Sequence, residues 1–187
     1  MWLSSARRTT KRLQDFVLDH PIFKSPEHLA QLLLSKFVIA DEVTIPIGRD
    51  FRALAGFDQS SYERQRFVYR VAMVAIALTA ATSRDKRFVS VVWHLRRMVR
   101  TEMQNRWDHT DETADSAIEE ATQDCTHLLF TPPGEDRGLS LSWPQEWLKR
   151  SGVDEVNPIV LFAVSQTWKQ QYMSVVEFTS RADLSRA

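Results

Sequence analysis

Three side chains with metal-binding chemistry share one helix face in the second half of the chain. Glu120, Asp124 and His127 stand at positions i, i+4 and i+7, so in a helix they project from the same side. Asp124 and His127 also have the acid-x-x-His spacing of carboxylate-bridged di-iron bundles, in which a second such pair stands on another helix. No other histidine of this sequence follows an acid at that spacing. A solvated polar face opposite an apolar stripe is therefore the favoured interpretation.

A second acidic pattern begins the same segment. Asp111, Glu112 and Asp115 form an acid-acid-x-x-acid pattern, the spacing with which magnesium-dependent prenyl transferases and some all-α nucleotide hydrolases hold metal. Hydrolases of that class need converging acids from a neighbouring helix, whereas Glu119 and Glu120 follow on the same helix. Acids in a first helical turn also suit the helix dipole. A metal-dependent or nucleotide-processing all-α enzyme, with ligands from both patterns, is kept as an alternative function.

Nucleophilic catalysis finds little support in the sequence. Cys125 is the only cysteine, and it falls on the apolar stripe of its predicted helix, where a small thiol is inert packing. The chain has no Gly-x-Ser-x-Gly elbow and no phosphate-binding glycine loop, and it holds only five glycines. We therefore predict no catalytic residue and no cofactor, and we expect a non-enzymatic protein.

Charge is distributed unevenly along the chain. Residues 84–106 hold seven Lys or Arg against two acids, whereas residues 108–136 hold nine acids and no Lys or Arg. Three interpretations compete: the two blocks pair with each other, one of them faces a protein partner, or the basic helix binds phosphates. Internal pairing is favoured. Arg96, Arg97 and Arg100 are the residues whose surroundings decide between these interpretations.

Nucleic-acid binding by the basic 84–106 helix is a further alternative. Such a surface needs cations and stacking aromatics exposed together, but Phe88 and Trp93 are readily explained as packing residues. No recognised nucleic-acid-binding motif is visible, and the net charge is zero. This alternative is not favoured.

Tryptophan is unusually frequent, with six copies. Trp143 and Trp147 lie one helical turn apart, where they could anchor a partner or clamp a short helix to the core, and clamping is favoured. The leading function is nevertheless a helical protein-interaction module, acting through the charged helix faces or the Trp143–Trp147 region. We expect a protein partner or a homo-oligomer.

Composition indicates an ordinary globular chain. The 187 residues are 43% hydrophobic and 26% charged, which suits one domain with its own core, and the single cysteine favours a reducing, cytoplasmic setting. The apolar run Val71–Ala81 is too short to span a membrane and suits a buried central helix. Residues 1–20 predict an amphipathic helix that docks on the core. The basic residues within 1–18 leave membrane-surface contact or organelle targeting as alternatives.

Helix signals recur along most of the chain. Ser25 and Pro26 predict a helix start, followed by an apolar stripe to about Ala40, and Asp58 or Ser60 predicts the start of the next helix. Helical spacing is most regular over 88–107, continues beyond a polar break at 108–111, and returns after Asn157 and Pro158. Segment 43–47 is at most a short edge strand, and 131–141 is a Pro/Gly loop. Together these signals predict an all-α bundle of about seven helices.

Overall fold

The fold is all-α, as predicted. The computed structural model describes residues 22–23, 25–40, 58–130, 145, 147–153 and 158–184. In chain order its elements are β1 (Ile22–Phe23), α2 (Pro26–Leu33), the π-helix η1 (Leu34–Ile39), α4 (Gln59–Arg84), α5 (Phe88–Trp107), α6 (Asp111–Phe130), α8 (Pro158–Arg181) and β2 (Asp183–Leu184). The predicted helix 1–20, edge strand 43–47 and loop 131–141 lie outside the described residues.

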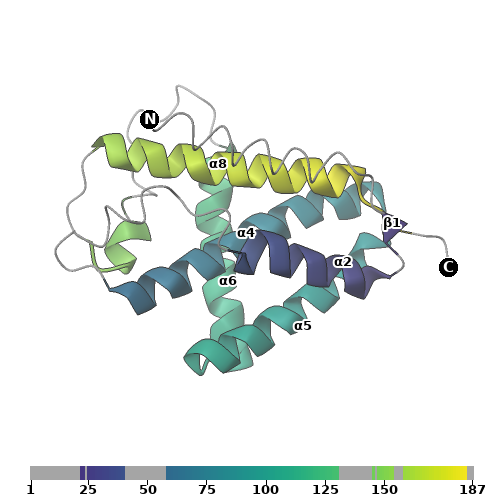
Figure 1. Ribbon diagram of the computed structural model, residues 1–187, viewed down its shortest axis with the longest axis horizontal. Coiled ribbons are helices and arrows are strands. Elements are labelled where there is room, and N and C mark those ends of the chain that lie inside the picture. Colours follow the sequence, from purple (N-terminus) through teal and green to yellow (C-terminus); the bar gives the residue numbers. More distant parts are fainter. Residues whose placement is uncertain are drawn as a thin grey trace.

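The central element is α4, which contacts η1, α5, α6 and α8 (Figure 1). Asp58 caps its start, because the carboxylate accepts hydrogen bonds from the backbone N–H groups of Ser60 and Ser61 at 3.2 and 3.1 Å. Most side chains from Phe67 to Leu78 are buried, so the apolar run forms the core as predicted. By length and composition alone α4 could cross a membrane, but a buried core helix has the same properties.

The predicted start of α2 is confirmed. Ser25 accepts a hydrogen bond from the N–H of His28 at 3.1 Å, and Pro26 occupies the first turn. The helix continues into η1, and the side chain of Arg70 closes its end by donating to the carbonyls of Val38 and Ala40 at 3.1 and 3.0 Å. An arginine of α4 therefore fixes where the α2–η1 segment ends.

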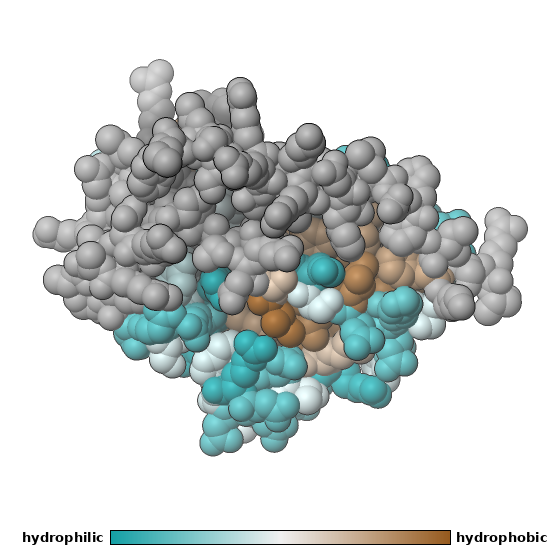
Figure 2. All heavy atoms as spheres, viewed as in Figure 1, coloured by the Kyte–Doolittle hydropathy of each residue, from teal (hydrophilic) through white to brown (hydrophobic). Residues whose placement is uncertain are grey.

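A tight turn joins α5 to α6. Asp108 adopts a left-handed conformation (φ 56°, ψ 34°) and stops α5, and Thr110 accepts from the N–H of Thr113 at 3.3 Å at the start of α6. The two helices meet at this turn and then diverge (Figure 1). On the face shown in Figure 2, polar surface gathers at the lower edge, where the turn lies, and apolar surface gathers above it.

Residues 22–23 and 183–184 pair in a short parallel ladder that the sequence did not predict. Ile22 faces Asp183 and Phe23 faces Leu184 in register. Arg87, which precedes α5, donates a hydrogen bond to the Leu184 carbonyl and so ties this ladder to the bundle.

Candidate functional site

An open apolar groove lies between α4, α5 and α6, and we call it the α5–α6 groove. Its volume is about 450 Å³, within the range of ligand pockets. The apolar lining consists of Val71, Ala75, Leu78, Val92, Leu95, Val99 and Ile118. Ala75, Val92 and Ile118 remain partly exposed, so the groove offers apolar surface to solvent.

The groove exists because α5 and α6 pack on different neighbours. α5 packs mainly against α2 and α6 mainly against α4, whereas α5 and α6 have less contact with each other. The two helices diverge from the Asp108 turn (Figure 1), and between them Ala75 of α4 remains partly exposed. Each wall extends over about two helical turns, or roughly 10 Å.

Ion pairs join the two walls at the groove rim. Both Arg96 and Arg100 bind the carboxylate of Asp115 with two nitrogens each, and their Nε atoms lie 3.1 and 3.0 Å from Asp115 Oδ1. Arg100 also lies 3.5 Å from a carboxylate oxygen of Asp111. Hydrogen bonds from Arg100, and then from Arg96, hold the pKa of the Asp115 carboxyl well below its ordinary range. Arg96 and Arg100, two of the three arginines singled out from the sequence, therefore form ion pairs with Asp111 or Asp115, two of the five proposed metal ligands.

Replacing Asp115 with Asn should change how stability depends on pH. Because the folded-state pKa of Asp115 is lowered, the carboxylate contributes stability above about pH 4, and this contribution is lost as the pH falls towards the folded-state value. We expect the free energy of unfolding of the wild-type protein to fall more steeply between about pH 5 and pH 2 than that of the Asp115→Asn variant. Urea unfolding across this range measures both curves, and parallel curves would contradict the assignment.

The outer edge of the α5 wall carries an exposed strip, here called the Trp93 lip, which consists of Val89, Trp93 and Arg97. Trp93 is 58% exposed and Val89 is 54% exposed, the largest exposed apolar side chains of α5. The Arg97 guanidinium lies 5.4 Å from the Trp93 ring centre, in cation–π range, and 4.0 Å from Glu27 of α2. Arg97 is thus the one proposed partner-binding arginine that does not bind Asp115.

Trp93 is the site residue that sequence reasoning missed. The sequence alone favours a packing role for it, but it lies two positions after Val91, a buried residue, and so points to roughly the opposite side of the helix. The spacing of the apolar residues in α5 already indicated that Trp93 is exposed. The buried stripe of α5 contains Phe88, Val91, Leu95, Val99 and Met103, and Trp93 does not belong to it.

The acids of the predicted metal-binding face bind side chains from other parts of the chain. Asp124 accepts a hydrogen bond from the Tyr69 hydroxyl at 2.5 Å, and Arg150 lies 3.4 Å from Asp124 and 3.9 Å from Glu120. Burial first, and then the bond to Asp124, raise the pKa of the Tyr69 hydroxyl well above its ordinary value. These acids therefore dock residues 147–153. The His127 side chain lies outside the described part.

Metal binding has no geometric support within the described residues. No group of three or more His, Cys, Asp or Glu side chains lies close enough there to hold an ion. Cys125 is fully buried, and burial raises the pKa of its thiol far above the ordinary value, in agreement with inert packing.

Trp147 lies in the core. It is 0% exposed, and its ring centre is 5.6 Å from that of Trp168 and 5.5 Å from that of Tyr62. The ring thus clamps residues 147–153 to the bundle, the interpretation that the sequence favoured, and it is inaccessible to a partner. Trp143 lies outside the described residues.

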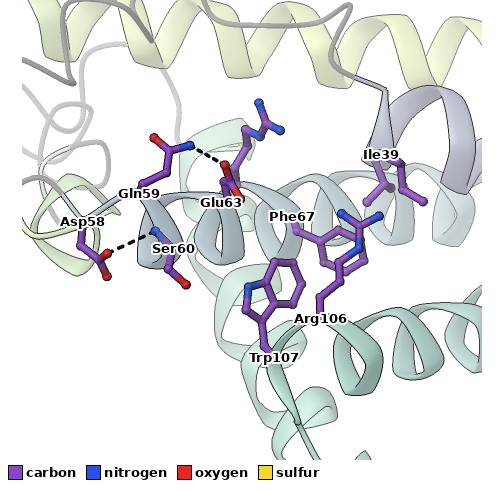
Figure 3. Close-up of a pocket in the computed structure, with 10 residues that line it drawn as sticks. Ile39, Asp58, Gln59, Ser60, Glu63, Phe67, Arg106 and Trp107 are labelled. Atoms are coloured by element: carbon purple, nitrogen blue, oxygen red, sulfur yellow. Dashed lines mark hydrogen bonds between the residues drawn. The ribbon is translucent and has the colours of Figure 1, made fainter.

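A larger cavity of about 610 Å³ lies between the start of α4, the end of α5 and η1 (Figure 3). Most of its polar side chains already have partners. Asp58 caps α4, Glu63 accepts from Gln59, and Arg106 binds Glu102 at 2.8 Å while its guanidinium lies 5.8 Å from the Phe67 ring centre. This cavity is less suited to recognition than the α5–α6 groove, whose lining is mainly apolar.

Comparisons with protein families, with curated proteins and with solved structures found no match for this chain. The chemistry of the site itself is therefore the basis for a function.

Proposed function

We propose that this chain is a non-enzymatic protein-interaction module whose docking surface is the α5–α6 groove together with the Trp93 lip. The observation that carries the proposal is the placement of an open apolar groove between a basic helix and an acidic helix. Apolar surface surrounded by charged side chains is the usual composition of a protein-recognition surface.

The residue types on this surface support partner binding. Tryptophan and arginine dominate interface hot spots, and the Trp93 lip presents both, with the guanidinium of Arg97 beside the indole. Arg96 lines the groove and stands three positions after Trp93, so the two side chains are neighbours on the surface of α5. A partner seated in the groove would therefore also reach the lip.

The two alternative functions have weaker support. The acids of the enzyme alternative are engaged by arginines, since Asp111 and Asp115 face Arg100 while Glu120 and Asp124 face Arg150. The nucleic-acid alternative needs several cations that are available together to phosphates, but Arg100 is bound to Asp111 and Asp115, and two nitrogens of Arg96 also bind Asp115. No observation favours either alternative over a protein partner.

Site-specific photo-crosslinking in cells that produce the protein tests the proposal. A benzophenone amino acid in place of Trp93 should form a discrete adduct with another protein, because it stands on the proposed docking surface. The matched control carries the same amino acid in place of Met173 of α8, which is exposed to a similar extent (61% against 58%). Absence of an adduct at position 93, or the same adducts at both positions, would contradict the proposal.

A further inference from the structure

The shape and charge of the α5–α6 groove also specify its occupant. We infer that the groove receives an amphipathic helix of a partner protein, with an acidic flank towards α5 and a basic flank towards α6. This inference rests on the proposed function, because it names the partner chemistry of the same surface.

The walls of the groove have helical dimensions. α5 lines it with residues at i, i+3, i+4 and i+7, from Val92 to Val99, and α6 does so over a similar length from Asp115 to Gln123. The resulting length of roughly 10 Å matches two turns of a helix. A helix in such a groove inserts apolar side chains spaced at i, i+3 or i+4, and i+7. The apolar floor that α4 provides, in which Ala75 is partly exposed, would cover them.

The rims of the groove differ in charge. On the α5 side Arg96 remains 58% exposed although it binds Asp115, and Arg97 stands one residue further along. On the α6 side Glu119 is exposed, and no ion pair within the described part of the chain involves it. An acidic flank of the occupant would meet Arg96 and Arg97, and a basic flank would meet Glu119.

Opposite rims also determine the direction of the occupant. A helix with one acidic and one basic flank satisfies both rims in one orientation only, because reversing it in the groove would place its acids against Glu119. A helix with the same charge on both flanks always leaves one rim facing a like charge. The groove should therefore select helices with two different flanks.

A selection from a displayed library of helical peptides, with the full-length protein as the target, tests this inference. We expect enriched peptides to show apolar residues at helical spacing, acids along one flank and Lys or Arg along the other. Glu119→Lys should weaken their binding by at least about tenfold, and peptides whose basic flank is replaced by acids should recover it. Glu63→Lys, an equal charge change at an exposed position near the start of α4 and outside the groove lining, should have no effect.

The outcomes separate this inference from the proposed function. Some enriched peptides could lose binding in the Trp93→Ala variant and yet lack helical spacing or carry one charge on both flanks. Such peptides would overturn the inference about the occupant but would still support the proposed docking surface. Failure to enrich any peptide, or binding unaffected by Glu119→Lys, would also overturn it. A native mass measurement that shows a dimer broken by Glu119→Lys would identify a second copy as the occupant and overturn it too. The crosslink at position 93 tests the proposed function independently.

Discussion

Replacing Trp147 with alanine should lower the free energy of unfolding by about 3 to 5 kcal/mol, the usual cost of removing a buried tryptophan ring. The ring is fully buried and packs against both Trp168 and Tyr62. Its loss would leave a cavity between residues 147–153 and the core. Denaturant unfolding followed by circular dichroism measures the change.

The matched control is the same substitution at Trp93. This side chain is exposed, so Trp93→Ala should change the free energy of unfolding by no more than about 0.5 kcal/mol. The pair of variants separates a tryptophan that holds the fold from one that is available for binding. Similar destabilisation by both substitutions would show that the two tryptophans have been assigned wrongly.

The second large effect is expected at Arg70. Its side chain is 1% exposed and donates to two backbone carbonyls at the end of η1, Val38 and Ala40. Arg70→Leu removes two charge-assisted hydrogen bonds and leaves those carbonyls without this donor, so we expect a loss of about 3 kcal/mol.

Arg84→Leu, at the exposed end of the same helix, is the control for Arg70→Leu and should have an effect within about 0.5 kcal/mol. Urea unfolding of both variants gives the comparison. A loss below about 1 kcal/mol for Arg70→Leu would show that the end of η1 is held by other contacts.

Local sequence signals predicted the helices well, because they depend on neighbours along the chain. The apolar spacing of Val91, Leu95 and Val99 predicted α5, and each of these side chains is buried. Ser25 with Pro26 predicted the start of α2, and Asp58 predicted the start of α4. The side chains of Ser25 and Asp58 both accept the expected capping hydrogen bonds. Such signals need no knowledge of the tertiary fold.

The site could not be predicted in the same way, because it depends on how helices are placed relative to one another. The groove follows from the angle between α5 and α6, which α2 and α4 determine by packing against them. The pairing of Asp124 with Tyr69 and Arg150 joins residues far apart in sequence. By contrast, internal pairing of the basic and acidic blocks was the interpretation favoured from the sequence, because the two blocks adjoin along the chain, and Arg96 and Arg100 do bind Asp115.

The most direct test of the docking surface is the affinity for the protein that crosslinks at position 93, measured with the wild-type chain and with Trp93→Ala and Met173→Ala. Trp93→Ala should weaken binding by at least about tenfold while leaving the free energy of unfolding unchanged, as expected for an interface hot spot. Met173→Ala should bind like the wild type. Equal affinities of the wild type and Trp93→Ala would contradict the claim that the α5–α6 groove and the Trp93 lip bind a partner.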